Sequence, residues 1–118
     1  MERLKKYAPG LQTMLTEQLE EALAGPIDIW CPLTPSYQRD VAQQRRRHGE
    51  RFWWYVCCVP KAPYCTLFID HPATELRVWQ WQTWQRNIAG ILVWDTTYWT
   101  ARDDFAQNPY EDPMGYVA

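Results

Sequence analysis

A chain of 118 residues has the size of one domain, because a chain of this length can bury roughly two-thirds of the surface that it exposes when unfolded. Twelve basic against fourteen acidic residues leave a net charge of −2, which gives no long-range attraction to nucleic acid or to an anionic membrane, and neither is expected as a partner. No stretch approaches the roughly twenty apolar residues of a membrane-spanning helix, and residues 1–10 carry charges where a signal peptide needs an apolar run.

The four cysteines predict reduced thiols and no metal site. They show no C-x-x-C spacing and form no zinc-like pattern with either histidine, so no metal and no cofactor are expected. Cys57 and Cys58 are adjacent in a strand-like run, where successive side chains alternate between faces. We therefore expect these two side chains to point to opposite sides and not to bridge each other. This cysteine usage leaves the cellular compartment open.

The first half of the chain predicts a helix, a strand and a second helix. Apolar residues recur at helical spacing over 11–23, between Pro9-Gly10 and Gly25-Pro26, and predict the first helix. The apolar run over 27–33 predicts a buried strand. Ser36 is placed to cap a second helix over 37–48 that ends at Gly49.

The second half repeats the alternation. Residues 51–58 are rich in aromatic and β-branched side chains and predict a strand, which a proline-punctuated loop follows. A third helix is expected over 72–88 and a third strand over 90–99. The remaining segment, 100–118, is expected to be a loop or tail.

Helix and strand thus alternate three times, which predicts an α/β fold with a parallel sheet covered by helices. Three strands cannot close a barrel. Three alternatives remain open at this point: further chain elsewhere completes the barrel, copies of the chain associate, or the sheet stays open.

The ends of the second and third strands are the expected site, because the loops that follow strands converge at the C-terminal face of an α/β barrel. Tyr55 comes near one such end, and Trp94, Asp95 and Tyr98 come near the other. Aromatic rings beside a carboxylate suit a sugar, which stacks its C–H faces on rings and needs hydrogen-bond partners for its hydroxyls. The remaining tryptophans of the strands and the third helix are expected to pack between sheet and helices: Trp53, Trp54, Trp79, Trp81 and Trp84.

No catalytic residue is expected in this chain. Glycoside hydrolysis needs two carboxyl groups, or one carboxyl assisted by the acetamido group of the substrate. The adjacent acids Asp103-Asp104 and Glu111-Asp112 lie in the polar tail, and neither pair follows an apolar strand. The sequence also contains no G-x-S-x-G elbow, P-loop or dinucleotide fingerprint.

Three aromatic-rich runs, in this order, resemble the C-terminal part of the glycoside hydrolase family 123 catalytic domain, which is a domain of unknown function in many members. The runs are RFWWYVCC (51–58), KAPYCTLFIDHPATELRVWQWQTW (61–84) and GILVWDTTYW (90–99). The resemblance covers about residues 27–99. It implies a (β/α) barrel of the TIM type that acts on β-linked N-acetylgalactosamine. An adjacent Asp-Glu pair on an earlier strand would orient the acetamido nucleophile and supply the general acid/base, and this pair has no match here.

The resemblance therefore implies that residues 1–118 form a single partial domain, the C-terminal portion of a glycosidase-like barrel. In full-length context the enzyme would hydrolyse β-linked N-acetylhexosamine glycosides, while the isolated chain would be inactive. Tyr55, Trp94, Asp95 and Tyr98 would form part of the sugar-binding wall. The alternative is a non-catalytic carbohydrate-binding or oligomeric assembly module, in which the many tryptophans bind sugar or a partner chain.

Overall fold

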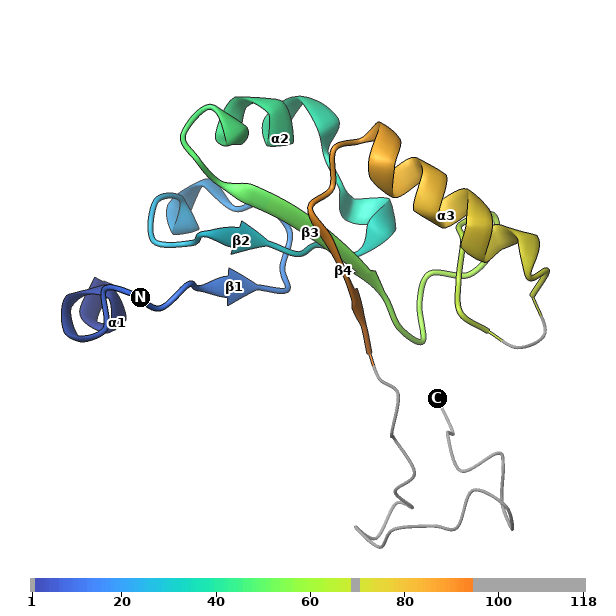
Figure 1. Ribbon diagram of the computed structural model, residues 1–118, viewed down its shortest axis with the longest axis horizontal. Coiled ribbons are helices and arrows are strands. Elements are labelled where there is room, and N and C mark those ends of the chain that lie inside the picture. The colour runs from blue at the N-terminus through green and yellow to red at the C-terminus, as the bar shows by residue number, and fades with distance from the viewer. Residues whose placement is uncertain (1, 69–70, 95–118) are drawn as a thin grey trace, which may run out of the picture.

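The computed structural model describes residues 2–68 and 71–94, which form a parallel sheet with helices (Figure 1). In chain order the elements are α1 (Glu2–Tyr7), β1 (Met14–Leu15), the 3-10 turn η1 (Glu21–Leu23), β2 (Ile29–Trp30), the 3-10 turn η2 (Thr34–Ser36), α2 (Arg39–Arg46), β3 (Arg51–Val56), α3 (Thr74–Gln85) and β4 (Gly90–Val93). None of the helices in this part of the chain has the length and apolarity needed to cross a membrane.

The four strands lie in the sheet in the same order as in the sequence, β1-β2-β3-β4, and every neighbouring pair is parallel. Parallel neighbours require a crossover connection, which α2 supplies between β2 and β3 and α3 supplies between β3 and β4. Both helices lie on the same side of the sheet (Figure 1). The chain is therefore wound in one direction, and neither α2 nor α3 covers the other face of the sheet, the helix-free face.

The side chains of β3 alternate between these two faces. Phe52, Trp54 and Val56 are buried, whereas the two residues between them, Trp53 and Tyr55, are half-buried. The ring of Tyr37, which precedes α2, meets Trp54 edge-on with centroids 5.8 Å apart. The indole Nε1 of Trp54 donates a hydrogen bond to Thr83 Oγ1 of α3 at 3.0 Å. The buried face of β3 is thus the face on which the helices pack.

Among the described residues, a core cluster lies between the sheet and the helices. Its buried members come from β2, α2, β3, α3 and the segments that connect the elements: Ile27, Trp30, Ala42, Phe52, Trp54, Val56, Cys65, Trp79 and Ile88. Burial of such apolar surface contributes about 25 cal/mol per Å² to folding, so the large indoles dominate this cluster.

Two polar clusters hold the first half of the fold in place. Glu50 is buried and accepts hydrogen bonds from Trp30 Nε1 at 2.8 Å and from Arg45 Nε and Nη2 at 2.9 and 2.6 Å. Asp28 forms an ion pair with Lys5 of α1 and accepts the backbone N–H of Thr13 at 2.6 Å. The first cluster joins β2, α2 and the start of β3, and the second joins α1 to the edge of the sheet.

The predicted helix over 11–23 is wrong. Met14 and Leu15 pair in parallel with Ile29 and Trp30, so this segment contributes a strand and then a 3-10 turn. Three of its four leucines still contact the core, since Leu15, Leu19 and Leu23 pack against the buried cluster, whereas Leu11 is exposed. Apolar residues spaced four positions apart can all reach the core from a helix, but they can also do so from a strand that is followed by a turn. In this segment the pairing of Met14 and Leu15 with β2 selects the strand.

The later elements are confirmed with shorter bounds. Helix α2 and strand β3 lie inside the predicted segments, and Gly49 has the positive φ of 85° that favours glycine after a helix. Ser36 does not cap α2, because it ends η2 and Gln38 precedes the helix. Helix α3 is followed by Asn87 at φ 54°, three residues before Gly90. The last predicted strand is confirmed as Gly90–Val93, while 95–99 and the predicted tail, 100–118, lie outside the described residues.

The prediction of an α/β fold with a parallel sheet is confirmed. Within the described residues the sheet contains four strands where three were predicted, because β1 lies in the segment assigned to the first helix.

Candidate functional site

The C-terminal ends of β3 and β4 form one face of a candidate binding site. The parallel register places Tyr55 beside Leu92 and Val56 beside Val93. Because side chains alternate along a strand, Tyr55 and Leu92 share the face opposite the helices, and Trp94 continues that face two residues beyond Leu92. Two neighbouring strands therefore bring aromatic side chains together on the helix-free face.

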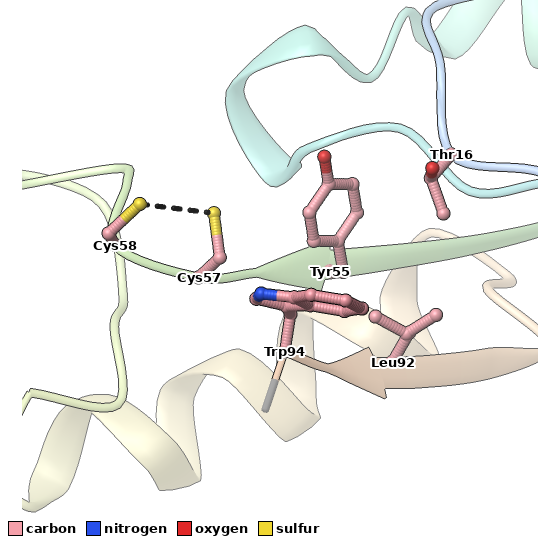
Figure 2. A pocket seen from close by; sticks show the side chains of 6 residues that line it. All are labelled: Thr16, Tyr55, Cys57, Cys58, Leu92 and Trp94. Atoms are coloured by element: carbon pink, nitrogen blue, oxygen red, sulfur yellow. Dashed lines mark hydrogen bonds between the residues drawn. The ribbon is translucent and has the colours of Figure 1, made fainter. Parts of the chain in front are cut away.

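These side chains line a cavity of about 390 Å³ (Figure 2). The lining residues come from the ends of three strands: Thr16, Tyr55, Cys57, Cys58, Leu92 and Trp94. Figure 2 shows the rings of Tyr55 and Trp94 on the same side of the two strands. Trp94 is 61% exposed, so a large part of its indole is open to a ligand. The lining is mostly apolar, with a hydroxyl, a phenol, the indole N–H of Trp94 and two thiols as polar groups.

The phenol of Tyr55 stays protonated at neutral pH. Desolvation raises its pKa above the ordinary value of 10.0, and the nearby cysteines and Glu17 raise it further. A protonated phenol can both donate and accept a hydrogen bond. Tyr55 therefore offers an apolar ring and a neutral polar edge to the cavity.

The thiols of Cys57 and Cys58 lie side by side, which makes the prediction of opposite faces wrong. Their Sγ atoms are 3.9 Å apart, in a weak S–H···S contact (Figure 2). Strand β3 ends at Val56, and the chain bends there, with the Cys57 N–H donating to the carbonyl of Val59 at 2.8 Å. Strict alternation applies only inside a strand, so a bend can bring adjacent side chains to one side.

The other two cysteines are buried thiols, as expected. Neither Cys31 nor Cys65 forms a disulfide. Burial raises the pKa of Cys31 to about 11 and also raises that of Cys65. Both thiols therefore remain protonated and shielded at neutral pH.

Two of the four predicted sugar-binding residues meet in the cavity. Tyr55 and Trp94 line it together, whereas Asp95 and Tyr98 lie outside the described residues. The sequence reasoning missed Thr16, because residues 11–23 were assigned to a helix. Recognition of Met14–Leu15 as a strand would have placed Thr16 at a strand end, where site residues of parallel sheets gather.

The five tryptophans assigned to packing divide into three groups. Trp54 and Trp79 are buried in the core, as predicted. Trp53 is half-buried on the helix-free face, against Gly90, and therefore does not pack between the sheet and the helices as predicted. The prediction is wrong for Trp81 and Trp84, which are 67% and 79% exposed, because they lie on the side of α3 that faces away from the sheet.

The described lining suits binding and offers no carboxyl group for acid/base chemistry. Within residues 2–68 and 71–94, no three His, Cys, Asp or Glu side chains gather in a way that could hold a metal ion. What the cavity offers a ligand is ring surface with a few hydrogen-bonding groups at its margin, which is the usual composition of a small-molecule site.

A family model described as "Glycoside hydrolase 123, catalytic domain" matches residues 2–117. The match covers nearly the whole chain and extends well beyond residues 27–99. No curated protein matches.

Proposed function

The chain belongs to the family of glycoside hydrolase 123 catalytic domains, and on that premise we propose that it is the C-terminal portion of a barrel that hydrolyses β-linked N-acetylhexosamine glycosides. Membership of a glycoside hydrolase family implies carbohydrate substrates. Within that class we propose N-acetylgalactosamine as the sugar, and full-length context as the active form.

The winding of the sheet supports a partial (β/α) barrel of the TIM type. Four parallel strands follow one another in sequence order, with both long crossover helices on one side. In a barrel of this type the helices form the outer ring and the opposite face of the sheet encloses the interior. Among the described strands, β1 and β4 each have one unpaired edge, to which further strands could be added.

The single observation that carries the proposed binding role is the pairing of Tyr55 and Trp94 at the cavity. The cavity lies at the C-terminal ends of parallel strands, where TIM-type barrels hold their substrates. A volume of about 390 Å³ is at the lower end of the range typical of ligand sites, which suits one sugar ring. We further propose that Asp95 and Tyr98, next along the chain, belong to the same wall.

We propose that the catalytic carboxyl groups come from outside this chain. Hydrolysis assisted by the acetamido group of the substrate still needs one carboxyl group as acid/base, and the family resemblance implies a second carboxyl group that orients the acetamido group. The sequence contains no Asp directly followed by Glu, and the described lining of the cavity contains no carboxyl group. The isolated chain is therefore expected to bind the sugar without cleaving a glycoside.

A tryptophan-fluorescence titration with N-acetylgalactosamine tests the binding role, with glucose as the control sugar. A saturable change for the acetamido sugar and a flat trace for glucose are expected, because Trp94 is an exposed indole at the cavity. Identical traces for both sugars would contradict the proposed specificity. Release of the aryl group from an aryl β-N-acetylgalactosaminide by the pure chain would contradict the proposed need for carboxyl groups from outside it.

The second candidate function is a non-catalytic carbohydrate-binding or assembly module. The observation that favours it is the exposed side of α3, where Trp81 and Trp84 lie beside Val78 and line a hollow of about 450 Å³. Exposed aromatic clusters of this kind are common at protein interfaces. Light scattering over a range of concentrations separates the candidates: a monomer at every concentration contradicts assembly, and a defined oligomer supports it.

A further inference from the structure

Cys57 and Cys58 form a pair of adjacent thiols at the margin of the cavity. Both side chains are half-buried, both line the cavity, and their sulfur atoms point to the same side (Figure 2). The Sγ–Sγ distance is 3.9 Å. The proposed glycosidase function makes no use of either sulfur atom.

The distance suits a bridge through one atom. A disulfide requires sulfur atoms about 2.05 Å apart, so direct bonding would need the backbone to move. A trivalent arsenic centre is pyramidal, with bond angles of about 95–100°, so two bonds of about 2.3 Å from sulfur place the sulfur atoms roughly 3.4–3.5 Å apart. The observed Sγ–Sγ distance of 3.9 Å is closer to this separation than to a disulfide bond, and a small rotation of the two side chains closes the difference. We propose that Cys57 and Cys58 form a two-thiolate modification site for a trivalent, thiophilic centre, of which an organic arsenoxide is the simplest example.

The site is specific to this pair. Cys31 and Cys65 are buried, with 0% and 7% of their surface exposed, and neither lines the cavity. A reagent in solution therefore reaches Cys57 and Cys58 first. Since the two residues are neighbours in the chain, the second sulfur is held beside the first before any ligand arrives, and its bond forms at a high effective concentration.

The reaction is a balanced exchange without oxidation or reduction. Each thiol loses its proton and forms one arsenic–sulfur bond, the arsenic–oxygen bond of the arsenoxide breaks, and the oxygen leaves as water with both protons. Arsenic remains trivalent throughout. The product is a ring that contains arsenic, both sulfur atoms and the backbone between the two residues.

Phenylarsine oxide and intact-protein mass spectrometry test the site on the whole chain. One adduct per chain is expected, together with the loss of two thiols that react with a disulfide reagent in the native protein. The adduct should resist an excess of 2-mercaptoethanol and be removed by 2,3-dimercaptopropanol, because only a dithiol competes with a two-point attachment. An adduct that the monothiol removes, or the absence of an adduct, would overturn the proposal.

Three single substitutions locate the site. Cys57→Ser and Cys58→Ser should each weaken phenylarsine oxide binding by a factor on the order of 10², because each leaves a single attachment. Cys65→Ser should bind as tightly as the unmodified chain, since Cys65 does not line the cavity. The proposal would be refuted if Cys57→Ser or Cys58→Ser still bound phenylarsine oxide tightly. It would also be refuted if a folded Cys65→Ser lost tight binding, because other thiols would then bind the arsenic. The result for the unmodified chain does not depend on the folding of any variant.

Discussion

The indole of Trp53 lies directly over Gly90, so that a Cβ atom added to Gly90 would be 2.3 Å from Trp53 Cε2. The two residues are partners in the parallel register of β3 and β4. A glycine at the start of β4 is therefore required by the close approach of a neighbouring side chain. The contact lies on the helix-free face, two residues before Tyr55 and Leu92, the pair that lines the cavity.

Gly90→Ala should destabilise the fold by about 1–3 kcal/mol, the usual cost of overpacking, because the ring of Trp53 must move or the strands must separate. Chemical denaturation of the two proteins measures the difference. Gly10→Ala is the matched control, since a Cβ at Gly10 would meet nothing within 4 Å. Equal stability of Gly90→Ala and the unmodified chain would show that Trp53 does not occupy this space.

Glu50→Ala should cost about 3 kcal/mol of unfolding free energy. The substitution removes the acceptor of Trp30 Nε1 and leaves Arg45, whose side chain is only 16% exposed, without its carboxylate partner. The double variant Glu50→Ala with Arg45→Met should lose less unfolding free energy than the two single variants lose together, because it leaves no unpaired charge. Urea denaturation of all four proteins gives the coupling energy. Strict additivity would be inconsistent with the ion pair.

Asp28 should make the stability depend on pH in the acid range. The hydrogen bond from Lys5 and that from the Thr13 backbone lower the pKa of Asp28 from 3.8 to about 2. A pKa lowered by folding means that the stabilisation is complete above pH 3.8 and is lost as the pH falls towards 2. Asp28→Asn should therefore be less stable than the unmodified chain at pH 6, and this difference in stability should become smaller below pH 4.

Urea midpoints measured from pH 7 to pH 2.5 test this dependence. Lys5→Met should reproduce most of the effect, because the Lys5 hydrogen bond is the largest cause of the lowered pKa. A gap between Asp28→Asn and the unmodified chain that stays constant over the whole range would rule out a lowered pKa at this residue.

Trp94→Ala should weaken binding of N-acetylgalactosamine at least 10-fold, or about 1.4 kcal/mol, because it removes the exposed ring of the cavity. Trp84→Ala is the matched control, since Trp84 is also exposed but lines a different hollow on α3. Isothermal titration calorimetry is the preferred measurement because it does not depend on indole emission. Equal losses in both variants would place the sugar elsewhere.

Local sequence signals were sufficient to predict a helix or a strand wherever its segment carried one strong pattern. The aromatic and β-branched run at Arg51–Val56 and the apolar start of Gly90–Val93 are both strands, and α2 and α3 lie inside the predicted segments. Alternating elements of this kind predict a parallel α/β sheet, because parallel neighbours need crossover helices. Tyr55 and Trp94, which line the cavity, could be selected as candidate site residues because they lie at strand ends.

The remaining features of the fold and of the candidate site were decided only by the tertiary structure, because they depend on contacts between residues that the local sequence pattern does not reveal. Met14–Leu15 became a strand because β2 offered a parallel partner, which its helical spacing could not reveal. The register of β3 with β4 set Tyr55 beside Leu92 and Trp53 over Gly90. The bend after Val56 brought the thiols of Cys57 and Cys58 together, because alternation ends where the strand does.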